Sequence, residues 1–161
     1  LETEHFYVIG VNSIRRRYHT RGHISLSQIQ EIDLKLQQAP AHKIKLIAAH
    51  QPFYTPPDHS HGVKDCPMLG RIALEQWSQH GLNGLLHGHL HHAAVYDLNQ
   101  IYQLGVSHPV LDIHAGTATS YRLHAGLPNS LNIILPNADV QHLSFNAETN
   151  HFELMQQNTS D

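Results

Sequence analysis

The residues of this chain that are best suited to chemistry are histidines that follow two short apolar segments. Residues 85–92 read Leu-Leu-His-Gly-His-Leu-His-His, and residues 46–52 read Leu-Ile-Ala-Ala-His-Gln-Pro. If the run before the glycine is a strand, residues two apart project to the same side, so His89 and His91 would leave the strand end together. His50 would end a second strand in the same way. Because imidazole is the commonest metal ligand in proteins, this pattern predicts a metal-dependent hydrolase site.

The composition is that of a globular domain with an unusual number of histidines. The chain has 161 residues, of which 40% are hydrophobic, 14% are charged and seventeen are histidine. The formal net charge of −3 gives no reason to expect general nucleic-acid or membrane binding, and no apolar stretch approaches the length of a membrane span. Cys66 is the one cysteine, so no internal disulfide can form and we expect a reducing, cytoplasmic location.

In the first half of the chain, local signals predict an alternation of strands and helices. Ser25 and Gln28 form a plausible capping box, and Pro40 should end the following helix near Gln38. Gly88 should allow a sharp turn after its strand. Strands are expected at 5–11, 44–49 and 82–86, and helices at 25–38 and 69–80.

The second half has short strand candidates separated by turn residues, as is typical of antiparallel hairpins. A turn is expected at Asn99-Gln100. Strands are expected at 94–98, 101–104, 110–115, 130–135, 140–145 and 151–155. The whole pattern predicts an α/β fold with helices on one face of a mixed sheet and an antiparallel extension. In open α/β sheets ligands bind at the carboxyl ends of the strands, where these histidines are expected.

Three motifs stand in order along the chain: His50-Gln51-Pro52, Gly88-His89-Leu90-His91 and Ala115-Gly116-Thr117-Ala118. Together they resemble the C-terminal half of the calcineurin-like metallophosphoesterases. The resemblance covers nearly the whole chain, so it implies that residues 1–161 are the C-terminal half of such a domain. The fold that it implies is part of a four-layer αββα sandwich, in which a mixed sheet is followed by antiparallel C-terminal strands.

The resemblance also implies a site and a reaction. In the family, two divalent metal ions (Mn, Fe, Zn or Ni) and a bridging hydroxide hydrolyse a phosphate ester. By resemblance, His50 and His89 would bind one metal and His91 the other. Arg122 is a candidate for binding the substrate phosphate, because a guanidinium group binds phosphate oxygens bidentately.

The chain departs from the family pattern in its carboxylates. The family has Asp-x-His, Gly-Asp-x-x-Asp and Gly-Asn-His-Asp/Glu elements upstream of these histidines, but none precedes His50 and no Gly-Asp dipeptide occurs. Asp112-Ile113-His114 matches Asp-x-His by letter, but it lies downstream, and we interpret it as a coincidence on a core strand. His87, inside the strand, could support His89 and His91.

Truncation is the simplest explanation of this departure. The chain begins with Leu1, and its first residues already look like interior sequence. We therefore expect a fragment whose parent protein is a metallophosphoesterase. Alone, it should have little activity, and its three imidazoles should hold at most one ion. Since a divided sandwich exposes apolar sheet and strand edges, the fragment should associate with its missing N-terminal half or with itself.

Two other functions fit parts of the sequence. One is a non-catalytic metal-binding or scaffold module on the same fold. The other is a metallo-β-lactamase-type hydrolase, because His87-x-His89-x-His91-His92 resembles the His-x-His-x-Asp-His run of that family. That family, however, has aspartate where His91 stands, and its run follows an early β hairpin.

Overall fold

The fold is a mixed α/β arrangement of two sheets and three α-helices within the described part of the chain. The structure is a computed structural model. The described residues are 1–14, 21–57, 63–121, 123 and 126–155.

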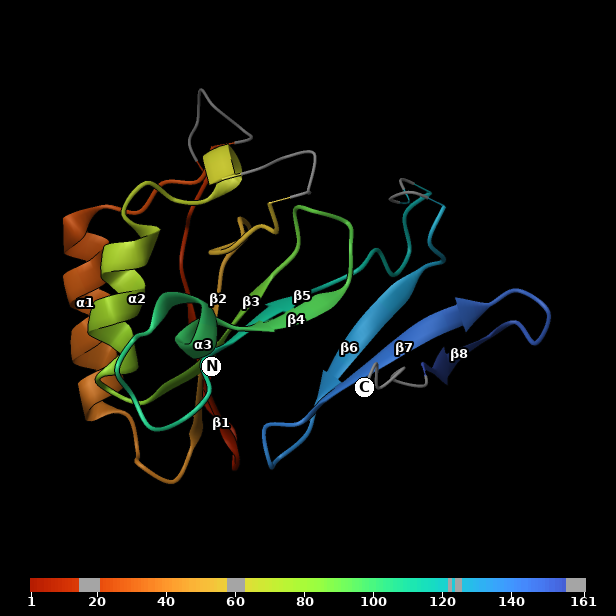
Figure 1. Ribbon diagram of the computed structural model, residues 1–161. Coiled ribbons are helices and arrows are strands. Elements are labelled where there is room, and N and C mark those ends of the chain that lie inside the picture. The colour runs from red at the N-terminus through yellow and green to blue at the C-terminus, as the bar shows by residue number, and fades with distance from the viewer. Residues whose placement is uncertain (15–20, 58–62, 122, 124–125, 156–161) are drawn as a thin grey trace.

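The larger sheet has five strands in the order β1-β2-β3-β5-β4. Strands β1, β2, β3 and β5 are parallel, and β4 runs antiparallel to β5. Because β2 and β3 are parallel neighbours, their carboxyl ends meet at the same edge of the sheet (Figure 1). The bounds are β1 Phe6–Gly10, β2 Ile44–Ala48, β3 Leu82–His87, β4 Ala94–Asp97 and β5 Leu111–His114.

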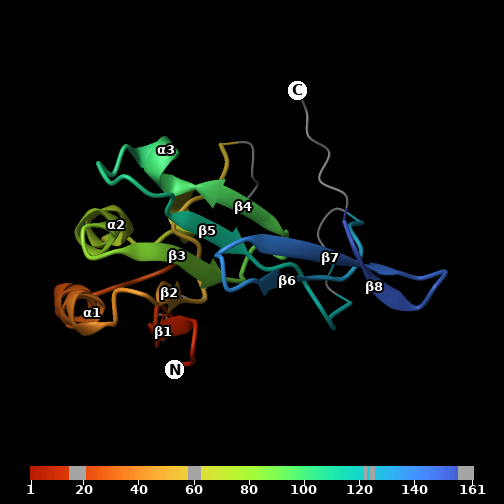
Figure 2. The same cartoon turned by 90° about the horizontal axis from the view of Figure 1, so that it is seen from below.

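Helices α1 (Leu26–Gln38) and α2 (Gly70–Ser78) lie side by side on one face of this sheet (Figures 1 and 2). The predicted capping box is present, because Gln28 N–H donates to Ser25 Oγ and Ser25 N–H donates to Gln28 Oε1. Trp77 is fully buried and donates through Nε1 to the carbonyl of Ile29, which joins the two helices over the core. In the described residues, no helix is both long enough and apolar enough to cross a membrane.

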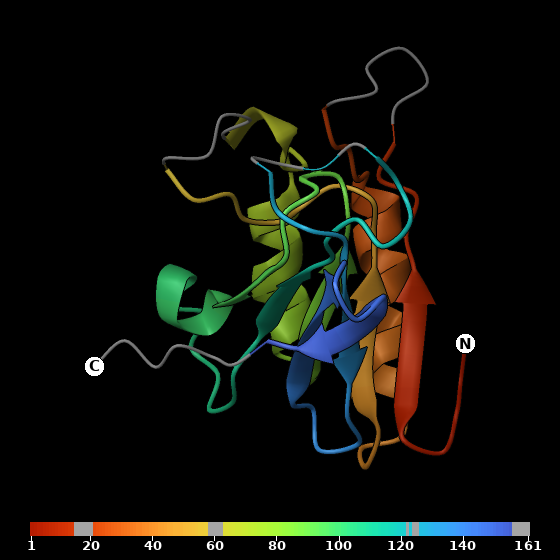
Figure 3. The same ribbon diagram turned by 90° about the vertical axis from the view of Figure 1, so that its right-hand side faces the viewer.

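The smaller sheet is antiparallel and consists of β6 (Ser130–Ile134), β7 (Val140–Asn146) and β8 (His151–Leu154). It lies across the face of the larger sheet that is opposite the helices (Figures 2 and 3). Ser130 is its one buried residue, and every residue of β7 is only partly buried. Both faces of this sheet are therefore incompletely covered by the residues that the structure describes.

The expected strand at 101–104 and the expected turn at Asn99-Gln100 were wrong. Residues Leu98–Tyr102 form the short helix α3. Asp97 is its N-cap, with Oδ1 accepting from Asn99 N–H at 2.9 Å. The Asn99 side chain then donates to the carbonyls of Val106 and His108. These side-chain bonds to the backbone favour the helical turn over extended pairing. The other expected strands and helices are present, with ends that differ by at most two residues.

Candidate metal centre

Two of the three histidines expected at the site lie next to each other. His50 follows β2 and His89 follows β3, and Ala49 N–H donates to the Leu86 carbonyl where the two strands end. His89 Nδ1 lies 3.2 Å from His50 Nε2, and the ring centroids are 5.1 Å apart at an interplanar angle of 78°. Parallel pairing of β2 with β3 is therefore what brings these imidazoles together.

The backbone around His89 differs from the expected extension of the strand. Strand β3 ends at His87, and both His89 and His91 are in the left-handed region with φ 55°. The sequence predicted that strand alternation would place His89 and His91 on one side. This prediction was wrong, because neither residue belongs to the strand. Gly88 does not supply the turn by a positive φ, and a Cβ added to it would meet no atom within 4 Å.

His91 contacts a different segment. Its Nδ1 lies 2.8 Å from Thr117 Oγ1, in the Ala115–Ala118 segment that follows β5. Asn129 supports this segment by donating to the Thr117 carbonyl at 2.6 Å. Among the described residues, His50, His89 and His91 do not form a group of three whose donor atoms all lie within 4.8 Å of one another. The expected substrate contact, Arg122, lies outside the described residues.

Two residues beside the histidine pair were not expected from the sequence. Ser13 is buried, donates to the Gln51 side chain and accepts from His50 N–H at 3.2 Å, so it holds the backbone at His50. Asp65 is also buried, and its Oδ2 lies 3.5 Å from His89 Nε2. Asp65 comes from a 3₁₀ turn in a proline-rich loop, so no local signal in the sequence links it to His89.

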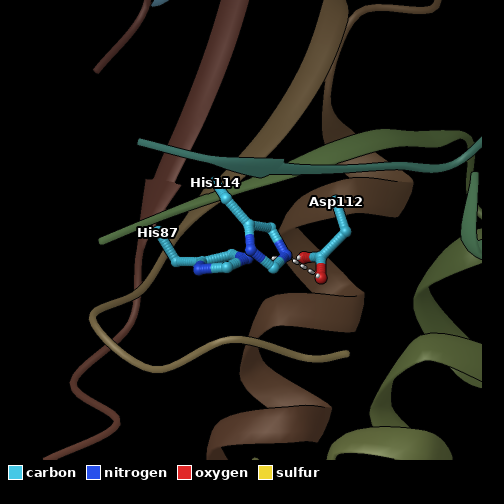
Figure 4. Close-up of side chains that lie close together, drawn as sticks. All are labelled: His87, Asp112 and His114. Atoms are coloured by element: carbon cyan, nitrogen blue, oxygen red, sulfur yellow. Dashed lines mark hydrogen bonds and ion pairs between the residues drawn. The ribbon is translucent and has the colours of Figure 1, made fainter. Parts of the chain in front are cut away.

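A second group of possible ligands lies deeper in the larger sheet. His87, Asp112 and His114 are all buried, and their donor atoms all lie within 4.8 Å of one another. Asp112 Oδ1 lies 3.0 Å from His87 Nε2, and Asp112 Oδ2 lies 3.0 Å from His114 Nε2. Both imidazoles approach the carboxylate from the same side (Figure 4). The Asp112-Ile113-His114 segment lies on a core strand, as expected, and its Asp112 and His114 belong to a cluster that could bind a metal ion.

Burial and mutual contact set the charges of this cluster. Burial by itself would raise the pKa of the Asp112 carboxyl, but the His87 and His114 imidazoles beside it outweigh burial and hold that pKa below its ordinary value. Burial lowers the pKa of His114, and the hydrogen bond to Asp112 offsets only part of this effect. Near neutral pH, Asp112 is therefore a carboxylate and His114 is a neutral imidazole, which is the form that binds metals.

Comparison with known proteins gives structural likeness at low sequence identity. No family model matches the chain, and no curated protein sequence matches it. A crystal structure from Staphylococcus aureus, of a protein described as a candidate 5′-nucleotidase in complex with α-ketoglutarate, aligns with a TM-score of 0.44 and 15% sequence identity. The alignment covers 92% of this chain and 26% of that one, so the chain spans about a quarter of its length. A likeness at this TM-score carries no argument about activity.

Proposed function

We propose that this chain provides the histidine side of the metal centre of a phosphoric ester hydrolase. The observation that carries the proposal is the 3.2 Å approach of His89 Nδ1 to His50 Nε2 at the carboxyl ends of two adjacent parallel strands. Two nitrogens that bind the same tetrahedral ion at about 2.0–2.1 Å lie about 3.3 Å from each other. The observed spacing therefore fits two ligands of a single ion.

Backbone strain at the same place supports this proposal. His89 and His91 both have φ 55°, a conformation that costs a residue with a Cβ about 1 kcal/mol. Such strain concentrates at functional sites, where the surrounding structure holds side chains in the geometry that the chemistry requires. Two strained histidines within three residues favour a ligand role over a role in packing.

A divalent ion bound here would polarise a phosphoryl oxygen and lower the pKa of a bound water. The imidazoles of His50 and His89 would hold it, with His91 as the proposed ligand of a second ion. Asp65, 3.5 Å from His89 Nε2, would orient the His89 ring. Imidazole ligands suit Zn, Ni and Fe and are also found with Mn, the metals that the family resemblance implies. Arg122 remains the proposed contact to the substrate phosphate.

Catalysis needs carboxylates that these 161 residues do not supply in the family pattern. We propose that they come from polypeptide beyond this chain, which would also complete a four-layer sandwich by covering the β6-β7-β8 sheet. The exposure of this sheet supports the proposal, since Ile133 is 42% exposed and Leu154 is 59% exposed. Without that polypeptide, a second copy of the chain is the proposed occupant of the same surface.

The test is hydrolysis of bis(4-nitrophenyl) phosphate with added Mn²⁺ or Zn²⁺. It compares this 161-residue chain with the polypeptide as its gene encodes it, including any residues beyond Leu1 and Asp161. We expect hydrolysis by the encoded polypeptide, a loss of at least about 100-fold on His50→Ala or His89→Ala, and no loss on His151→Ala, which changes an exposed histidine of β8.

Each other outcome has a definite meaning. Rapid hydrolysis by the 161-residue chain would contradict the proposal that carboxylates come from elsewhere. Metal binding by the encoded polypeptide without hydrolysis of phosphate esters would contradict the enzyme proposal and favour a non-catalytic metal-binding module. Full activity of the His89→Ala variant would remove the histidine pair from the reaction.

A further inference from the structure

The His87-Asp112-His114 cluster is more deeply buried than the proposed hydrolase site. His50 and His91 are exposed, whereas the side chains of His87 and Asp112 are 0% exposed and that of His114 is 1% exposed. His87 and His114 are register partners on the neighbouring strands β3 and β5, and Asp112 projects to the same face two residues before His114. The cluster therefore joins two strands inside the fold.

The contact between His87 and Asp112 is close but does not satisfy either group. His87 Nε2 lies 3.0 Å from Asp112 Oδ1, yet neither atom makes a hydrogen bond of acceptable geometry to any described residue, and neither does His87 Nδ1. A buried polar atom that lacks a hydrogen-bond partner destabilises the folded state. His87 Nε2 and Asp112 Oδ1 therefore face each other without a well-aligned hydrogen bond between them. Two ligands of the same metal ion would be positioned in this way.

The charge of the cluster leads to the same conclusion. A carboxylate is expensive to bury unless an opposite charge lies beside it. Among the described residues, the ion-pair partners of Asp112 are His87 and His114, and neither a lysine nor an arginine pairs with it. A cation between the three side chains would offset the charge of the Asp112 carboxylate and would be bound by the ligand atoms that lack hydrogen bonds.

We propose that His87, Asp112 and His114 form a separate, buried metal site that takes a divalent first-row ion, with Zn²⁺ as the best match. Two imidazole nitrogens and one carboxylate oxygen are a common ligand set for Zn²⁺. The 3.0 Å separations are close to the roughly 3.3 Å expected between ligands of a tetrahedral ion. The ion would tie β3 to β5 and would not need the proposed phosphoesterase function.

The experiment measures metal binding in a variant that lacks the His50-His89 pair, His50→Ala/His89→Gly. Zn²⁺ content after dialysis and the visible ligand-field spectrum of Co²⁺ are the two readouts, and thermal unfolding with and without Zn²⁺ is the third. We expect one tightly held equivalent, a four-coordinate Co²⁺ spectrum and a higher midpoint with Zn²⁺. Adding Asp112→Asn should weaken binding at least about 100-fold.

Asp33→Asn is the matched control, because Asp33 is another buried aspartate beside a histidine, with Oδ1 3.5 Å from His80 Nε2. It should leave Zn²⁺ binding unchanged. If Asp112→Asn does not fold, His87→Gln and His114→Gln carry the same test, because both keep the carboxylate. The proposal is overturned if the His50→Ala/His89→Gly variant holds no stoichiometric ion, or if the folded cluster variants bind Zn²⁺ as tightly as their background. Neither result would affect the test of the phosphoesterase proposal, which rests on His50 and His89.

Discussion

His50 Nε2 and His89 Nδ1 lie 3.2 Å apart although the two residues are thirty-nine positions apart in the chain. Parallel pairing explains this approach, because Ala48, the last residue of β2, is the register partner of Leu86, and β3 ends one residue later at His87. A shift of this register would separate the imidazoles, so the core packing that fixes the register also fixes the candidate metal centre.

The left-handed backbone at His89 predicts an unusual order of stabilities. Because φ is 55° at this position, His89→Gly should be more stable than His89→Ala by about 1 kcal/mol. Equilibrium unfolding in urea measures the difference. His92 does not have a positive φ, so His92→Gly should be less stable than His92→Ala. Equal stabilities of the two His89 variants would show that the left-handed conformation is not held in solution.

Ser13 should stabilise the segment that carries His50. Ser13→Ala removes a donor to the buried Gln51 side chain and an acceptor for His50 N–H, and we expect a loss of about 1–3 kcal/mol in the free energy of unfolding. The same unfolding measurement on Ser107→Ala, an exposed serine, should give a change within about 0.5 kcal/mol. Similar effects of both variants would remove the proposed role of Ser13.

Gly116 and Gly88 form a matched pair for substitution by alanine. A Cβ at Gly116 would lie 1.8 Å from Ser130 Oγ, whereas one at Gly88 would meet nothing within 4 Å. Gly116→Ala should therefore cost about 1–3 kcal/mol of stability by overpacking, and Gly88→Ala should be neutral or slightly stabilising.

Removal of the clashing hydroxyl provides the control for this pair. Ser130→Ala added to Gly116→Ala should recover part of the loss, because the nearest remaining atoms lie beyond 3 Å. Thermal unfolding is measured for four variants: the two single glycine variants, Ser130→Ala and the double variant. The results give the coupling free energy between the substitutions at Gly116 and Ser130. A Gly116→Ala variant as stable as the parent would contradict the close approach of β6 to this segment.

Cys66 should be unreactive and should make stability depend on pH. Burial raises the pKa of its thiol from 9.0 to about 11. Between these pH values the Cys66 thiol keeps its proton in the folded chain and loses it in the unfolded chain. The contribution of Cys66 to the free energy of unfolding is therefore complete below pH 9 and is lost as the pH rises through about 11. The loss corresponds to at most about 2–3 kcal/mol.

Two measurements check this behaviour. Iodoacetamide at pH 8 should alkylate Cys66 slowly in the native chain and rapidly in urea. The Cys66→Ala variant should show a flatter fall of unfolding free energy across the same alkaline range. Rapid alkylation of the native chain at pH 8 would mean that the thiol is accessible and its pKa is not raised.

Most of the secondary structure could be predicted from local signals. The Ser25-Gln28 capping box, the stop before Pro40 and the apolar runs before His50 and Gly88 act through contacts within a few residues, so their effect can be recognised in the sequence. Helix α3 has a local N-cap in Asp97, but it also depends on bonds from Asn99 to carbonyls seven and nine residues away, which the sequence does not show. Long-range side-chain bonds of this kind override a weak local pattern.

Some of the candidate ligands could be predicted from local sequence, and others could not. Strands that end in histidine, together with the rule that parallel strand ends meet at one edge, were sufficient to predict that His50 and His89 lie together. The pairing of His87 with Asp112 and His114, and the approach of Asp65 to His89, required the tertiary structure. The register of β3 against β5 and the course of the loop that carries Asp65 are set by packing among distant residues, which local sequence does not encode.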